Sequence, residues 1–245
     1  MRAILAELLD LVLPPCCARC SGPVAGREAL CAACWGALHP IDPGACLHCQ
    51  ALPGTRAGRC GSCSAAGAAL EACVAAVWFE GDTPAWIHRV KYPHRGIRGL
   101  DSAALAVLAL LAERAAGRVP GAAPECILPV PLHPRAARRR GFNPAALLAR
   151  RMARVRGVAW NPAALERRRD TPSQTGLSRA QRRRNVAGVF RARHRLPRRI
   201  WLVDDVVTTG ATLAEAARAA RRAGAREILA VCAARTPAPS ARAGP

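Results

Sequence analysis

Four Cys-x-x-Cys pairs within the first 63 residues constrain the fold of this chain more than any other feature of its sequence. Each of the first four cysteines has a counterpart 29 positions later, so the segment repeats the unit Cys-x2-Cys-x10-Cys-x2-Cys. Two such pairs present four thiolates, the tetrahedral ligand set of structural Zn²⁺ sites. We therefore predict two structural zinc ions with no open position for chemistry. Their ligands are Cys17, Cys20, Cys31, Cys34, Cys46, Cys49, Cys60 and Cys63.

The repeat predicts sequential pairing, in which the first four cysteines hold one ion and the last four hold the other. An interleaved arrangement also fits the spacing. Cys16 adjoins Cys17 and is a rival ligand, although the repeat favours Cys17. Disulfide bonds and iron–sulfur ligation are the other uses of such pairs. Zinc binding contributes on the order of 10–16 kcal/mol per site, which would fold a segment too small and too rich in Gly and Pro to fold alone.

The apolar stretch 4–13 bears on the choice between zinc and disulfides, because a signal peptide would indicate export. Glu7 and Asp10 interrupt this stretch, and Pro-Pro and cysteines follow where a signal peptidase needs small residues. We expect a short amphipathic helix packed on the rest of the protein. The sequence has no apolar run of about 18 residues, so we predict no membrane span and expect a cytoplasmic location.

The formal charge of +21 favours anionic partners, either nucleic acid or phosphorylated small molecules. A merely solubilising surface is the alternative. Arginine supplies all the basic residues except Lys91. Between Arg135 and Arg199 there are twenty arginines against two acids, a stretch that could follow a phosphate backbone. Aromatic residues that could stack on bases are scarce in that stretch.

Ordinary globular patterning begins near residues 65–69, where we place a domain boundary. The first domain, 1–69, would hold the N-terminal helix and the zinc sites, the second would span 70–236, and 237–245 would be a disordered tail. The 245 residues suffice for two small domains or one large one. In the second domain we expect strands at 73–80, 125–130 and 200–203 and helices at 83–92, 97–116 and about 143–156. This alternation predicts an α/β domain with a parallel sheet.

The stretch 200–212 carries the strongest indication of a ligand. An apolar strand run is followed by Asp204 and Asp205, then by a hydroxyl-rich loop around Gly210, and then by a helix. Backbone N–H groups and hydroxyls at a helix N-terminus can cradle a phosphate, and carboxylates can hold Mg²⁺ or accept hydrogen bonds from sugar hydroxyls. We predict a site for a phosphorylated sugar. An ordinary strand-loop-helix crossover is the alternative.

Two further segments could converge on that site, because ligands of parallel sheets bind at the carboxyl ends of the strands. A basic segment follows the strand that ends near Val130, and its Arg135 and Arg140 could face a pyrophosphate. The hydroxyl-rich and basic segment 171–185, which includes Gln174 and Arg179, is a candidate lid. A solvated surface loop with a short helix from Ser178 is the alternative for this segment.

The motif Val-Asp-Asp-Val-Val-Thr-Thr-Gly-Ala-Thr at 203–212 resembles the signature with which type I phosphoribosyltransferases bind phosphoribosyl pyrophosphate (PRPP). The resemblance implies that Asp204 and Asp205 meet the ribose hydroxyls and that the loop binds the 5′-phosphate, with Mg²⁺ accompanying PRPP. The loop residues are Thr208, Thr209, Gly210, Ala211 and Thr212. The expected fold is α/β, a type I phosphoribosyltransferase-like parallel sheet with flanking helices, preceded by a double zinc ribbon of two four-cysteine sites.

The order of motifs narrows the resemblance. A Cys-x-x-Cys ribbon, Pro-Val-Pro-Leu, Arg-Gly-Phe-Asn, Gln-Thr-Gly-Leu-Ser-Arg and the acidic signature follow one another as in the ComF/GntX family, from about Cys16 to Thr236. Pro144 departs from the family, which commonly has Gln after Arg-Gly-Phe-Asn. These proteins are associated with DNA uptake in natural competence, which implies single-stranded DNA, a competence helicase or DNA-processing proteins as partners.

Three functions are compatible with the sequence. The protein could handle single-stranded DNA with PRPP bound, it could be an active phosphoribosyltransferase with an unknown acceptor, or it could sense PRPP without chemistry. We favour the first. Binding residues and catalytic residues are nearly the same set in this fold, so the motif indicates the ligand more firmly than the reaction.

Overall fold

A computed structural model describes residues 15–24, 28–55, 58–61, 63, 69–93, 99–170 and 179–237 of the chain, without the side chains of 179, 180, 182 and 183. The strands are β1 (Ala72–Trp78), β2 (Cys126–Pro129), β3 (Ala159–Trp160), β4 (Leu165–Arg167), β5 (Phe190–Ala192), β6 (Arg199–Val207) and β7 (Glu227–Arg235). The helices are α2 (Ala32–Gly36), α4 (Thr83–Lys91), α5 (Ser102–Ala116), α6 (Pro134–Arg140), α7 (Pro144–Arg156), α8 (Arg179–Val186) and α9 (Ala211–Arg222).

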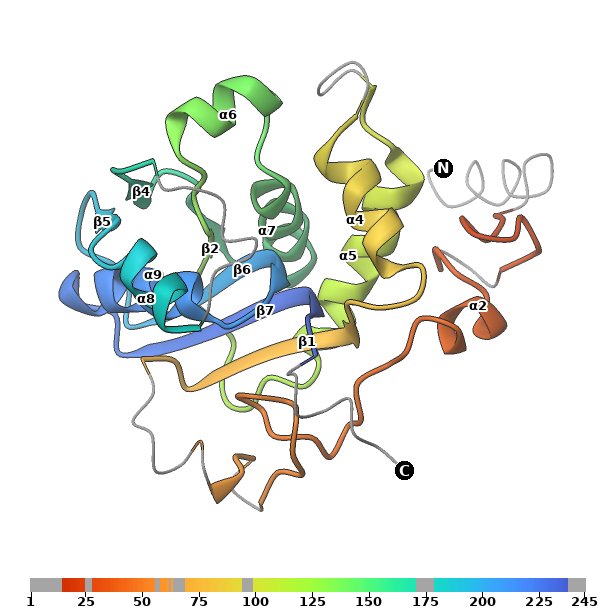
Figure 1. Cartoon of the computed structure of the whole chain (residues 1–245), viewed down its shortest axis with the longest axis horizontal. Coiled ribbons are helices and arrows are strands. Elements are labelled where there is room, and N and C mark those ends of the chain that lie inside the picture. Colours follow the sequence, from red (N-terminus) through yellow and green to blue (C-terminus); the bar gives the residue numbers. More distant parts are fainter. Residues whose placement is uncertain are drawn as a thin grey trace.

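In the described part of the chain, five parallel strands form one sheet in the order β1-β7-β6-β2-β3 (Figure 1). Strands β1, β2, β6 and β7 are mostly buried, as expected for a sheet that lies between helices, whereas β3 at the edge is exposed. Along β6, Trp201 and Val203 belong to the core shared with α4, α5 and α7, whereas Ile200 and Leu202 belong to the core shared with α9. Strands β4 and β5 form a two-stranded antiparallel sheet that packs against α9. Helix α8 lies between the two strands in the sequence, and we call this strand pair the β4–β5 hairpin. The predicted α/β fold is confirmed.

The cysteine-rich segment closes the outer edge of β1, whose backbone groups would otherwise be open to pairing with another chain. The N–H of Ile41 donates to the carbonyl of Ala76 at 2.9 Å. Gln50, 2% exposed, bonds both backbone groups of Ala75, with Nε2 donating to the carbonyl and Oε1 accepting from the N–H, each at 2.9 Å. Arg235, the last residue of β7, donates to the same Oε1 at 2.8 Å. The second half of the cysteine-rich segment is thereby fastened to two strands of the sheet.

Most predicted elements occur close to their expected positions. Predicted strands 73–80 and 125–130 correspond to β1 and β2, and predicted helices 83–92 and 143–156 correspond to α4 and α7. Cys73, Cys126 and Cys232, which have apolar neighbours in the sequence, are buried.

Two predicted boundaries are wrong for identifiable reasons. The helix expected from residue 97 begins at Ser102, because Asp101 Oδ1 accepts a hydrogen bond from the N–H of Ala104 and caps the helix there. The strand expected to end at Val203 continues to Val207, because its parallel pairing with β7 continues to that residue. Both acids of the signature therefore lie on the strand rather than after it.

The basic segment after β2 forms α6, a helix that the sequence analysis did not predict. Its start is marked by His133, whose side chain accepts from the N–H of Arg135, and by Pro134 in the first helical position. It ends at Gly141, which has a φ of +81°. These end signals were present in the sequence, but α6 has no buried residues and therefore no apolar periodicity that would have indicated a helix.

Three predictions fall on residues outside the described ranges: the N-terminal helix at 4–13, the loop 171–178 of the candidate lid, and the tail beyond 237. The helix expected from Ser178 is described from Arg179 as α8. Within the described ranges, no helix combines the length and hydropathy of a membrane span.

Candidate functional site

The predicted zinc ligands gather into two groups in the described part of the chain, and in each group the four sulfur atoms lie within 4.8 Å of one another. One group contains Cys17, Cys20, Cys31 and Cys34, and the other contains Cys46, Cys49, Cys60 and Cys63. A tetrahedral ion with Zn–S bonds of about 2.3 Å places its sulfurs about 3.8 Å apart. The Sγ atoms of Cys20 and Cys31 are 3.8 Å apart, as are those of Cys49 and Cys60. The grouping confirms sequential pairing and fits two structural zinc ions.

The second group also provides hydrogen bonds that suit a thiolate. The N–H groups of His48 and Cys60 donate to Cys46 Sγ at 3.4 and 3.2 Å. Burial alone would raise the pKa of Cys46, but backbone N–H groups, including that of Cys49, lower it to about 6. The thiolate is the form that ligates a metal. Cys16 is exposed and belongs to neither group, so Cys17 is the ligand that the repeat predicted.

The two acids of the signature lie near the carboxyl end of β6. This strand lies between β7 and β2 in the sheet (Figure 1). Each carboxylate accepts a hydrogen bond from the next backbone N–H, Asp204 Oδ1 from Asp205 at 3.0 Å and Asp205 Oδ1 from Val206 at 2.9 Å. Burial, together with the charge of Asp205, raises the pKa of Asp204 well above its usual value. The pair concentrates negative charge at the end of the sheet where ligands of parallel sheets bind.

Lys91, which the sequence analysis did not select as a site residue, faces this pair. It is the last residue of α4, and its Nζ lies 2.7 Å from Asp205 Oδ2, with the two side chains 26% and 8% exposed. Burial lowers the pKa of the ammonium, but the charges of Asp205 and Asp204 outweigh it and hold that pKa above its usual value. The residue could have been found, because it is the only lysine among 37 Lys and Arg residues.

Lys91→Met is expected to destabilise the zinc-loaded protein by about 2 kcal/mol, because it leaves the buried carboxylate of Asp205 without a counter-charge. Asp205→Asn in the same chain should restore most of that loss, because no charge then remains unpaired. Urea unfolding of the two single variants and the double variant gives the coupling energy. Additive single-variant effects would show that the pair is not coupled.

The loop between β6 and α9 leads into a helix N-terminus, a feature at which phosphates can bind. Gly210 has a φ of +74° and occupies the N-cap position of α9 without a side-chain cap. Thr209 Oγ1 accepts from the N–H of Ala211 at 3.4 Å, and Thr208 is exposed. The twelve-residue helix that begins here directs the positive end of its dipole toward the loop. The structure thus brings Thr208–Thr212 beside the two acids, and their role as the phosphate site remains a prediction.

The two arginines predicted to face a pyrophosphate differ in their position relative to the acids. Arg140 lies at the end of α6, with its guanidinium carbon 5.2 Å from the centre of the Tyr92 ring. Its positive charge slightly opposes the raised pKa of Lys91, which lies beside the acids. Arg135 is exposed in the first turn of the same helix. Gln174 lies outside the described residues, as does the side chain of Arg179. Arg140 therefore remains the better candidate of the predicted set.

A cavity of about 460 Å³ opens between the loop after β2 and the hairpin of β4 and β5. Its apolar lining includes Leu132 and Leu165, and its charged lining includes Glu166 and Arg167. Leu132 follows β2, whose residue Pro129 pairs with Val203 just before the acids, so this cavity opens at the same edge of the sheet as the acids. A second ligand could therefore reach the same strand end.

Comparison with known proteins covers both parts of the chain. Residues 8–67 match the family model described as a double zinc ribbon domain. The DNA utilization protein YhgH of Escherichia coli O157:H7 is 35% identical over 232 residues, which cover 92% of this chain and 99% of that protein. Competence protein F of Haemophilus influenzae is 32% identical over 218 residues, which cover 86% of this chain and 93% of that protein. With relatives aligned over nearly its whole length and a matching zinc ribbon, the chain belongs to the ComF/GntX family.

Proposed function

We propose that this chain binds PRPP with Mg²⁺ at the carboxyl end of β6 and serves DNA uptake, handling single-stranded DNA. One observation carries the proposal: the half-buried Asp204 and the buried Asp205 adjoin the N-terminus of α9, where the N-cap residue, Gly210, has no side chain to cap the helix. PRPP combines sugar hydroxyls with a phosphate on the same ribose. Hydroxyls donate to carboxylates, and phosphates accept from backbone N–H groups at a helix start, so the two halves of the site match the two ends of the ribose.

Each neighbouring side chain has a role in this proposal. Asp204 and Asp205 accept hydrogen bonds from the ribose hydroxyls, and the backbone and hydroxyls of Thr208–Thr212 hold the 5′-phosphate. Mg²⁺, when bound, neutralises part of the charge on the pyrophosphate. Lys91 exchanges its ion pair with Asp205 for the pyrophosphate, and Arg140 adds a second cation.

The DNA part of the proposal is supported by the relatives and by charge. The aligned relatives are named DNA utilization and competence proteins, and the formal charge of +21 suits a phosphate backbone. A competence helicase or DNA-processing proteins are the expected partners. We place the protein in the cytoplasm, where thiolates stay reduced and available to zinc.

The test is a calorimetric titration of PRPP into the zinc-loaded protein with Mg²⁺ present. We expect saturable binding of one PRPP per chain, weaker binding without Mg²⁺, and weaker binding of ribose 5-phosphate or pyrophosphate alone. These outcomes follow because each smaller ligand fills only part of the site. A folded protein with two zinc ions that releases no heat with PRPP would contradict the proposal.

Phosphoribosyl transfer is a second function, and the cavity lined by Leu132 and Leu165 favours it because an acceptor could bind there. A nucleophilic atom of the acceptor would form a bond to ribose C1 while the bond from C1 to the pyrophosphate oxygen breaks. Pyrophosphate release, measured with candidate acceptors and with single-stranded DNA, tests this function. Saturable PRPP binding without release would favour a sensor.

A further inference from the structure

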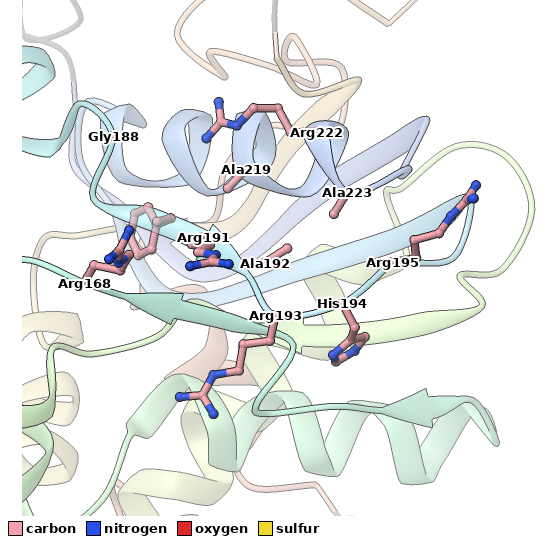
Figure 2. Close-up of a pocket in the computed structure, with 11 residues that line it drawn as sticks. Arg168, Gly188, Arg191, Ala192, Arg193, His194, Arg195, Ala219, Arg222 and Ala223 are labelled. Carbon is pink, nitrogen blue, oxygen red and sulfur yellow. The ribbon is translucent and has the colours of Figure 1, made fainter.

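A second cavity, of about 430 Å³, lies between the end of the β4–β5 hairpin and α9. Figure 2 shows that its labelled side chains come from three parts of the chain: Arg168 follows β4, Arg191 and Arg195 belong to β5 and the segment after it, and Arg222 lies on α9. The hairpin and α9 pack against each other, so these segments face one cavity although they are far apart in the sequence. We call this the arginine groove.

The arginine groove is lined by basic and small or apolar residues, and none of the described residues in its lining is an acid. Arg168, Arg191, Arg195 and Arg222 are exposed, and none of their guanidinium groups has an ion-pair partner in the described part of the chain. Arg193, also in the lining, is the exception: its Nε lies 3.1 Å from Oε2 of Glu166. Glu166 itself does not line the groove.

Some arginines near the groove that do not line it have carboxylate partners. Arg198 pairs with Glu227 at 3.2 Å, and Arg218 pairs with Glu215 at 2.8 Å. Like charges gathered in a concave surface repel one another more than isolated surface charges do, because the walls exclude water. A ligand with several negative charges would relieve that repulsion.

We propose that the arginine groove binds the phosphate backbone of single-stranded nucleic acid. The inference rests on the proposed DNA-handling function and names the surface that performs it. The cations are distributed over a hairpin, the segment after it and a helix. Arg191, Arg193 and Arg195 occupy every second position of the sequence. Guanidinium groups distributed over several elements fit a chain of phosphates better than one compact anion.

The shape of the groove favours a single strand over a duplex. A duplex is stiff over about 150 base pairs, so its phosphates cannot turn into a cavity between a hairpin and a helix. A single strand bends at each nucleotide and can enter. Phe190 lines the groove but is 3% exposed and offers no open face for stacking. Binding should therefore be electrostatic and nearly independent of base sequence.

The groove also adjoins the cavity beside the proposed PRPP site. Arg168 and Arg193 line both cavities, so the two are neighbours along the hairpin. A strand in the groove would lie next to the cavity near Asp204. The placement connects the two parts of the proposed function in space.

The experiment measures binding of a fluorescent thymidine 20-mer by anisotropy across a series of NaCl concentrations. The test variant is Arg168→Gln/Arg191→Gln/Arg222→Gln, and thermal melting verifies its fold. The control, Arg151→Gln/Arg154→Gln/Arg226→Gln, removes the same charge from exposed arginines outside the groove lining. Because each phosphate contact contributes about 0.7 to the salt slope for single strands, the test variant should bind at least tenfold more weakly at low salt, with a slope shallower by about 2.

The control variant should bind within about threefold of the wild type, since it retains the phosphate contacts that dominate affinity. Equal weakening of both variants would show that net charge alone attracts DNA, and no weakening of the test variant would exclude the groove; either result overturns the inference while the proposed function stands. A wild type that binds no single strand would overturn the DNA-handling function itself. Equal or tighter binding of a 20-base-pair duplex, or displacement of the 20-mer by micromolar tripolyphosphate, would overturn the assignment to a single strand.

Discussion

Cys46→Ser is expected to reduce the zinc content from two ions per chain to one and to unfold the second half of the cysteine-rich segment. A structural zinc site contributes on the order of 10–16 kcal/mol, as much as the whole net stability of a typical domain, about 5–15 kcal/mol. The effect should reach the sheet, because Gln50 bonds Ala75 and Leu47 accepts from the N–H of Cys73 at 2.7 Å. Elemental analysis and hydrogen exchange of the β1 amides measure both consequences.

Two matched variants make the zinc experiment specific. Cys16→Ser alters an exposed cysteine outside both groups and should leave two zinc ions and an unchanged melting temperature. Cys31→Ser should also lose one ion, but the outer edge of β1 around Ala75 should stay protected, because Gln50 lies in the other half. Two zinc ions in the Cys46→Ser protein would contradict the assignment, as would zero in the wild type.

Asp204→Asn/Asp205→Asn is expected to weaken PRPP binding by at least a hundredfold. Hydrogen bonds to a charged group contribute about 1.5–3 kcal/mol each, and the double substitution removes the charge from both acceptors. The variant should remain folded, because Asn has nearly the same shape as Asp. In addition, the side chain of Lys91 is 26% exposed, so its ammonium group can turn toward water. Calorimetric titration measures the loss, and unchanged zinc content and melting serve as controls. Retained affinity would contradict the role of the two acids.

The raised pKa of Asp204 adds a pH dependence whose sign can be stated. Burial and the charge of Asp205 favour the protonated form in the folded protein, so protonation begins above the ordinary carboxyl value of 3.8. PRPP affinity should therefore decline as the pH falls toward that raised pKa. The raised pKa has the opposite consequence for stability. Above that pKa, the charged carboxylate of Asp204 lowers the free energy of unfolding, so Asp204→Asn should be more stable than the wild type at neutral pH, by on the order of 1 kcal/mol. A stability difference between Asp204→Asn and the wild type that grows as the pH falls would contradict this assignment.

The parts of the protein predicted from sequence are those encoded by local spacing. The zinc groups follow from the 29-residue repeat, because the two thiols of a Cys-x-x-Cys turn lie close together whatever surrounds them. The strands and helices around the acids follow from apolar runs and from Pro and Gly end signals, as the starts of α4 and α7 show. Where a side chain outside the repeating pattern sets a boundary, as Asp101 does, the prediction missed it.

The sequence by itself therefore determined the zinc ribbon, the α/β class and the neighbourhood of Asp204, Asp205 and Thr208–Thr212, because each depends on residues close together along the chain. Only the tertiary structure brought Lys91 to Asp205, Gln50 to the edge of β1 and Arg222 to the hairpin arginines. These contacts join residues tens of positions apart or more, and their partners are selected by strand order and helix packing. No local pattern encodes that order, so the counter-charge of the acids and the arginine groove became visible only in the folded chain.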